Sequence, residues 1–190
     1  VEEVTLVDLD PLVTTLFRDR DELSQLNDGS LRDPRVRIVN EDAFLWLQRP
    51  DSNGSMDVVI VDFPDPSNYS VGKLYTNHFY RLLRRKLATH GVVAIQATSP
   101  FFSPEAYWCI IRTIRYEGFE VRPYHAYIPA FGEWGFVLAG TQPARDFNPL
   151  PTGLRFLDPP TLDLLFHFPA DLQPRDGEIN RLDNQLIVKL

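Results

Sequence analysis

The chain has 190 residues, 44% hydrophobic and 24% charged, which is typical of a globular protein with one substantial core. Its formal net charge of -7 argues against a surface for nucleic acid or anionic membrane and is compatible with a cationic small-molecule partner. The single cysteine, Cys109, cannot form an internal disulfide and lies in an apolar segment, which predicts a buried thiol and a reducing, cytoplasmic compartment.

Apolar runs alternate with helical patterns along the chain. Strands are expected at residues 4–9, 36–39, 58–61, 92–96, 121–127 and 135–139. Helices are expected at residues 12–26, 43–47, 77–87 and 104–116. Valine- and isoleucine-rich strands that alternate with helices indicate a mostly parallel sheet covered on both faces, with 58–61 as a central strand. The last two strands should pair antiparallel, because the connection between them is too short for a helical crossover.

This order of elements predicts a Rossmann-like α/β fold of the class I S-adenosylmethionine methyltransferase type. Such folds begin with a strand and a glycine-rich turn, whereas this chain runs from Val1 directly into what is typical of the second strand. We therefore expect upstream residues to supply the first strand, and we expect the 190 residues alone to be a poor enzyme. Exposed apolar edges near 4–9 would then favour a homo-oligomer. Prolines become frequent after Gly140, which predicts a Rossmann-like domain over 1–140 and an extension over 141–190 that packs on or beside it.

The run Asp57–Pro66 is an apolar strand that ends in two carboxylates, Asp62 and Asp65. Ligands of an open parallel sheet bind at the carboxyl ends of its strands. Two acids at that place suit a cationic substrate that must give up a proton. The alternative is that both side chains only cap turns and a helix start.

The chain also has a basic cluster, which is interpreted as a solvated helix end: Arg81, Arg84, Arg85 and Lys86.

Other polar residues follow the neighbouring strands. Asp8 suits hydrogen bonds to the two hydroxyls of a ribose, and Asp42, next to the small Ala43, suits an adenine amino group. Asp42 also suits the N-cap of the helix at Ala43, as Asp10 suits the helix at Leu12. Gln96 ends the strand that follows the two acids.

Taken together, these segments resemble the polyamine aminopropyltransferases, the spermidine synthase family. The resemblance covers about residues 4–140 and is carried by Val7–Asp10, Asp33–Val36, Glu41–Ala43, Asp57–Pro66, Leu74–Tyr80, Leu87–Gln96 and Ile128–Phe131. It is closest to a bacterial subgroup whose domain follows membrane-spanning helices, on residues Asp62–Asn68, Phe131–Phe136 and Asn180–Gln185. That subgroup implies a cytoplasm-facing domain covalently fused to upstream membrane helices.

The resemblance implies transfer of an aminopropyl group from decarboxylated S-adenosylmethionine, a co-substrate, to putrescine or a related polyamine, with release of methylthioadenosine. It implies no tightly bound cofactor and no metal. Asp62 matches the family's proton acceptor and Asp65 the acid that holds the diamine. The remaining implied site residues are Gln96, Phe131 and Trp134 for the substrate, and Asp8, Asp42 and Ala43 for the donor nucleoside.

The chain departs from the family pattern at three places. Phe63-Pro64 replaces small polar residues between the two acids, Ser67–Tyr69 replaces a Gly-Pro motif, and Phe131 replaces a tyrosine. Phe131 and Trp134 then either offer cation–π faces to an ammonium or belong to the core, while Glu133 would restore a polar contact. Two other functions stay open: an S-adenosylmethionine-dependent methyltransferase, and a non-catalytic domain that binds a nucleoside or polyamine.

Overall fold

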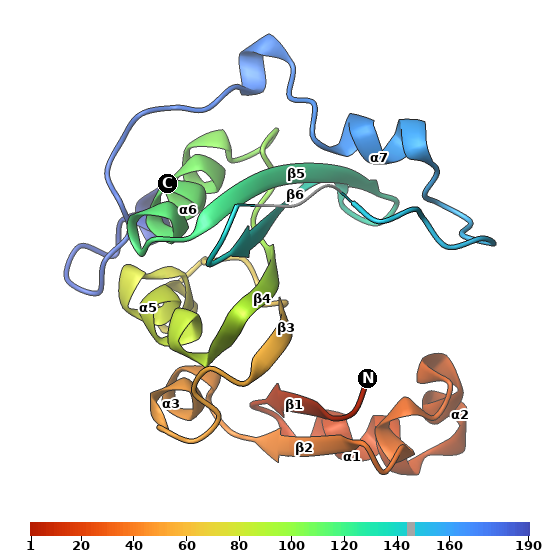
Figure 1. Ribbon diagram of the computed structural model, residues 1–190. Coiled ribbons are helices and arrows are strands. Elements are labelled where there is room, and N and C mark those ends of the chain that lie inside the picture. The colour runs from red at the N-terminus through yellow and green to blue at the C-terminus, as the bar shows by residue number, and fades with distance from the viewer. Residues whose placement is uncertain (144–146) are drawn as a thin grey trace. The chain divides into compact units, whose positions relative to one another are not determined.

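A computed structural model describes residues 1–143 and 147–190 (Figure 1). Contacts within the chain divide it into two compact units, Val1–Asp51 and Ser52–Leu190. Each unit is an α/β arrangement, and each is described by itself.

In the first unit, β1 (Val4–Asp8) pairs in parallel with β2 (Val36–Asn40). Between them lie α1 (Pro11–Asp19), α2 (Asp21–Ser24) and the short 3-10 turns η1 (Gln25–Asn27) and η2 (Ser30–Arg32). Helix α3 (Ala43–Gln48) follows β2.

The expected helix over 12–26 is wrong in its extent. Arg20 has an extended backbone, with φ -86° and ψ 121°, and it ends α1 by donating its N–H to Leu16 O at 3.1 Å. An extended residue cannot continue the helical hydrogen-bond ladder. A second, short helix therefore begins at Asp21.

The second unit contains a four-stranded sheet in the order β3-β4-β6-β5. Its strands are β3 (Met56–Val61), β4 (Leu87–Gln96), β5 (Glu120–Ile128) and β6 (Gly132–Gly140). Strand β4 is parallel to β3 and antiparallel to β6, and β6 is antiparallel to β5. The expected α/β fold with an antiparallel hairpin at its end is confirmed.

Helices cover one face of this sheet. The short α4 (Tyr69–Gly72) and the 3-10 turn η3 (Lys73–Tyr75) lead into α5 (Asn77–Lys86), and α6 (Pro104–Tyr116) follows β4. Helices α5 and α6 lie on the same face (Figure 1). Fully buried residues of this core include Tyr80, Val93, Ile95, Ile110 and Val137. No helix in residues 1–143 or 147–190 is long and apolar enough to cross a membrane.

Strand β3 lies at the end of its sheet, not at the centre as expected. Its one paired neighbour among the described residues is β4, so its other edge presents unpaired backbone groups. Val58 and Ile60, which point to the same face, are 65% and 77% exposed, so the expectation of cover on both faces also fails at this strand. At the start of β1, Val4 is exposed, and so is Leu9 just beyond its end, as expected.

Residues 147–190 pack on the sheet and helices of the second unit, to which they belong. Helix α7 (Pro159–Leu165) lies against β5, and the chain continues through η4 (Ala170–Leu172) back to α6 and ends at η5 (Leu186–Lys189) (Figure 1). The Arg122 guanidinium of β5 lies 4.1 Å from the centre of the Phe166 ring. On α6, the Trp108 indole donates to Leu172 O at 3.2 Å.

Two side chains test the expectations about burial. Cys109 is fully buried, as expected, and burial raises the pKa of its thiol. The prediction that Lys86 belongs to a solvated helix end is wrong, since this residue is 1% exposed. Its place on the inward face of α5, beside the buried Leu82 and Leu83, overrides the preference of a charge for water.

Candidate active site

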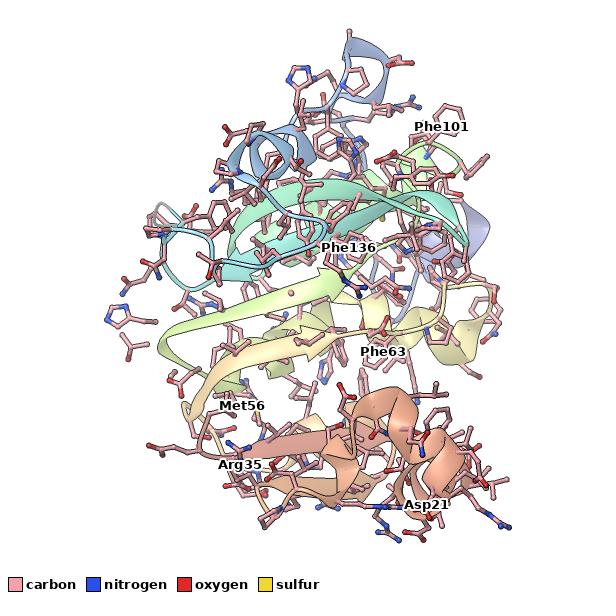
Figure 2. The ribbon with its side chains drawn as sticks, turned by 90° about the vertical axis from the view of Figure 1, so that its right-hand side faces the viewer. Asp21, Arg35, Met56, Phe63, Phe101 and Phe136 are labelled. Atoms are coloured by element: carbon pink, nitrogen blue, oxygen red, sulfur yellow. The ribbon has the colours of Figure 1, made fainter. Side chains whose placement is uncertain are left out.

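Asp62 and Asp65 lie in the loop that leaves the carboxyl end of β3. Figure 2 shows Phe63 just beyond that end of the strand, with Met56 at the opposite end. Asp62 is exposed to solvent and Asp65 is half-buried. The chain therefore presents one accessible carboxylate and one partly enclosed carboxylate at the end of the sheet where ligands bind.

Hydrogen bonds from two directions hold the backbone between these acids. The buried Tyr75 hydroxyl donates to Pro64 O at 2.9 Å and to Phe63 O at 3.3 Å. The Gln96 side-chain amide, at the end of β4, donates to Phe63 O at 3.0 Å. Gln96, expected to bind substrate, thus supports the loop that carries both acids.

The Phe63 ring packs away from the loop, on aromatic side chains of the core. It makes edge contacts with Phe79 of α5, at 5.5 Å between ring centres, and with Tyr75, at 6.5 Å. Core packing accounts for an aromatic residue where the family pattern has a small polar one.

Asp65 has an incomplete set of hydrogen-bond partners. Its Oδ2 accepts from Thr98 Oγ1 at 3.5 Å, whereas Oδ1 is buried with no hydrogen-bond partner among the described residues. Burial raises the pKa of Asp65, and the Thr98 hydroxyl opposes that shift. Burial, followed by the negative charges of Asp65 and Asp62, raises the pKa of Tyr75. A cation placed beside the Asp65 carboxylate would neutralise its poorly solvated negative charge.

The start of β6 is fixed beside the end of β4. Ala97 N donates to Gly135 O at 2.9 Å, and Ser99 Oγ donates to Glu133 O at 2.6 Å. A Cβ atom at Gly135 would lie 2.6 Å from Thr98 O, so β6 and the segment that follows β4 approach too closely for a residue with a side chain at this position. Strand β6 therefore brings Glu133 and Trp134 to the end of the sheet that carries Asp65.

Phe131, in the β5–β6 connection, and Trp134, in β6, are not fully buried. Phe131 is 62% exposed and Trp134 is half-buried, with 5.4 Å between their ring centres. The Glu133 carboxylate pairs with His125 Nδ1 on β5, so its polar contact in this structure is with His125. His125 Nε2 in turn hydrogen-bonds His167 O in the extension at 2.8 Å.

In the first unit, the carboxyl ends of β1 and β2 bring the expected nucleoside-binding residues together. Asp8 lies opposite Asn40 in the strand register, and Glu41 N donates to Asp8 O at 3.1 Å. Asp8 Oδ1 accepts from Asp10 N at 2.7 Å. Asp42 is the N-cap of α3 and lies directly before Ala43, the first residue of that helix. Its Oδ1 accepts a hydrogen bond from Phe44 N at 2.8 Å. The capping roles considered for Asp10 and Asp42 are both present.

Two residues that support the loop of Asp62 and Asp65 were not predicted from the sequence as site residues. They are Tyr75 and Thr98. Tyr75 lies in the Leu74–Tyr80 segment that carries the family resemblance, which was the only signal for it in the sequence; its burial is seen in the structure. No group of three or more His, Cys, Asp or Glu side chains within the described ranges is placed to hold a metal ion.

Residues 1–149 match the spermine/spermidine synthase domain. The chain belongs to this family. Two curated relatives support the assignment along the whole chain: a polyamine aminopropyltransferase of Leptospira interrogans, 49% identical, and polyamine aminopropyltransferase 2 of Ralstonia nicotianae, 51% identical. The matches cover 100% of this chain but only 38% and 37% of those proteins, so the chain spans well under half of their length.

Solved structures of spermidine synthases share this fold. A crystal structure of a spermidine synthase in complex with the transition-state analogue AdoDATO superposes with a TM-score of 0.78 at 25% identity, over 90% of this chain and 60% of that one. The spermidine synthase of Thermotoga maritima gives a TM-score of 0.75, also at 25% identity, over 90% of this chain and 59% of that one.

Proposed function

We propose that the full-length protein transfers an aminopropyl group from decarboxylated S-adenosylmethionine to putrescine or a related polyamine. The observation that carries this proposal is the pair Asp62 and Asp65 at the carboxyl end of β3, in a chain of the spermine/spermidine synthase family. The relatives named polyamine aminopropyltransferase and the neighbour that binds AdoDATO support it.

The reaction is a displacement at carbon. The amine lone pair forms a C–N bond to the carbon next to the sulfonium, the C–S bond breaks, and sulfur keeps the electron pair as methylthioadenosine leaves. The attacking amine is protonated in neutral water and must first lose its proton. Asp62 is the proton acceptor in this proposal, since its carboxylate is exposed at the strand end and open to an incoming amine.

Asp65 binds the second, charged nitrogen of the acceptor. Burial raises the pKa of Asp65, which means that its ionised form is poorly stabilised without a partner. An ammonium group in contact with the carboxylate would supply that partner and become fixed in place. Because positioning provides much of the acceleration in such a displacement, this contact contributes to the rate as well as to affinity.

Other residues have supporting roles in the proposal. Asp8 binds the ribose hydroxyls of the donor, and Asp42 with Ala43 binds its adenine. Phe131 and Trp134 offer ring faces to the cationic amine, which accords with the exposure of Phe131. Gln96 acts through the loop, by its bond to Phe63 O.

We also propose that the domain over 1–140 and its 141–190 extension form the cytoplasmic part of a protein with upstream membrane helices, and that the upstream residues supply the first strand. This rests on the resemblance of Asp62–Asn68 and Asn180–Gln185 to the membrane-fused subgroup. Membrane fractionation of the full-length protein tests it, and recovery of that protein entirely in the soluble fraction contradicts it.

The experiment for the function is methylthioadenosine release by the full-length protein, given decarboxylated S-adenosylmethionine with and without putrescine or spermidine. Asp62→Asn should lower turnover by about 10²- to 10⁴-fold, the usual contribution of a positioned general base. Asp57→Asn is the matched control, an exposed acid at the start of the same strand, and should leave turnover unchanged.

Absence of release with every amine, or an Asp62→Asn variant as active as the control, would reject the proposal. Transfer of a methyl group from S-adenosylmethionine itself would indicate a methyltransferase. Binding of nucleoside or polyamine without turnover would indicate a sensing domain.

A further inference from the structure

The end of the extension, residues 179–188, packs around one fully buried side chain. Asn180 is 0% exposed. Its backbone N–H donates to Thr113 Oγ1 of α6 at 2.9 Å, and its side-chain Oδ1 accepts from Ile187 N at 3.2 Å. These bonds close the segment on itself and fix it to α6.

Asn180 also bonds to both ends of the segment that follows the acidic loop. Its side-chain amide donates to Gly72 O, at the end of α4, at 3.3 Å. Its backbone carbonyl accepts from Asn77 N, the first residue of α5, at 3.0 Å. One buried residue of the extension therefore ties down the chain before and after η3.

Gly72 shows how closely the two segments approach. A Cβ atom at Gly72 would lie 2.6 Å from Val188 Cγ2 and 3.0 Å from Gln185 Oε1. The first distance is shorter than any normal contact between carbon atoms. A glycine at this position lets α4 rest directly on residues 179–188.

The tied segment contains Tyr75. The hydroxyl of Tyr75 reaches Phe63 O and Pro64 O, the carbonyl groups between Asp62 and Asp65. Hydrogen bonds and backbone thus run without a gap from Asn180, through Gly72 and Asn77, to the loop that carries both acids.

We propose that Asn180 is a positioning residue for the amine end of the site, acting through Gly72, Asn77 and Tyr75 on the Asp62–Asp65 loop. The proposal rests on the proposed function. It assigns residues 179–188 a role in amine placement rather than in donor binding, because the residues proposed for the donor nucleoside lie in the other unit, Val1–Asp51.

The experiment uses the full-length protein and three single variants. Asn180→Ala removes the side-chain bonds, and Gly72→Ala disturbs the same contact from the α4 side. Gln173→Ala is the control, since this side-chain amide also lies after Gly140 but donates to Phe168 O and Pro169 O, which are close to it in the sequence. The two measurements are steady-state kinetics with amine and donor varied separately, and hydrogen exchange of backbone amides followed by mass spectrometry.

Asn180→Ala and Gly72→Ala should each lower kcat/KM for the amine by about 10²-fold, the loss that a misplacement near 1 Å can cause. The KM for decarboxylated S-adenosylmethionine should stay within about twofold of the wild-type value, because the residues proposed for the donor lie in the other unit. A general structural defect would instead change the kinetic parameters for both the amine and the donor. Hydrogen exchange should become faster over residues 63–77 and remain unchanged in β4 and β6. Gln173→Ala should match the wild type in both measurements.

Equal losses for amine and donor, or faster exchange throughout the sheet, would overturn the proposal in favour of general destabilisation. Unchanged exchange over residues 63–77 in Asn180→Ala would overturn it as well. The exchange result stands whether or not the wild type releases methylthioadenosine, so it separates this inference from the function on which it rests.

Discussion

Gly135 on β6 is the position where a single methyl group should do the most damage near the site. A Cβ there would lie 2.3 Å from Tyr107 Cε2 and 2.6 Å from Thr98 O. Overpacking of this kind costs about 1–3 kcal/mol. The Tyr107 ring cannot move away freely, because its single hydroxyl proton is shared between Tyr124 O at 3.2 Å and Phe136 O at 3.1 Å, and loss of this donor's hydrogen bonding adds about 1 kcal/mol.

Gly135→Ala should therefore lower the free energy of unfolding by about 2–4 kcal/mol. For a unit of this size that corresponds to a fall in melting temperature of about 10 °C. Thermal unfolding of the full-length protein by scanning fluorimetry measures it. Gly140→Ala is the control on the same strand, since a Cβ there would meet nothing nearer than Gly91 O at 3.4 Å. Equal melting temperatures for the two variants would refute the reasoning from close contact.

Three further predictions follow from burial and exposure. Burial raises the pKa of Asp65, so this carboxyl favours the fold below its ordinary pKa and loses that contribution as pH rises through the raised value. Asp65→Asn should then raise the melting temperature at pH 7, an advantage that disappears in acid, while kcat/KM for the amine falls; a lower melting temperature at pH 7 would contradict this. The Cys109 thiol, fully buried and with a raised pKa, should resist iodoacetamide at pH 8 until the protein unfolds, and rapid native labelling would disprove its burial. The 190-residue chain should self-associate through the free edge of β3, and Ile60→Lys should reduce its light scattering; equal scattering would exclude that edge.

Local sequence patterns were sufficient to place most strands and helices of this chain. The valine- and isoleucine-rich run before Asp62 predicts a strand, and its end predicts where the acids lie, because both depend on neighbouring residues alone. The break at Arg20 was missed, since the apolar period on either side of it continues without a glycine or proline. The burial of Lys86 was also missed, because a charge is expected in water and only the packing of α5 places this one inside.

The supporting contacts of the site depend on tertiary structure and could not be predicted. Tyr75 reaches Pro64 O only because η3 packs under the acidic loop. The contact of Glu133 with His125 depends on the register of β5 and β6, in which His125 lies opposite Gly135. The buried Asn180 lies far along the chain from Gly72, Asn77 and Thr113, which it holds, so the sequence alone does not show these partners.

The strand order β3-β4-β6-β5 has a consequence for how the chain folds. Helix α6 carries the chain past the position next to β4 to the outer position of β5, and β6, made later, fills the place left between them. The connection between β5 and β6 is short, so pairing within this hairpin closes only a short stretch of chain. Its pairing with β4 joins Gln96 to Phe136 with all of α6 and β5 between them, and contacts of such long sequence separation are expected to form more slowly. We infer that the carboxyl end of β4, with Gln96 and Thr98, takes its final form last, when the finished hairpin docks.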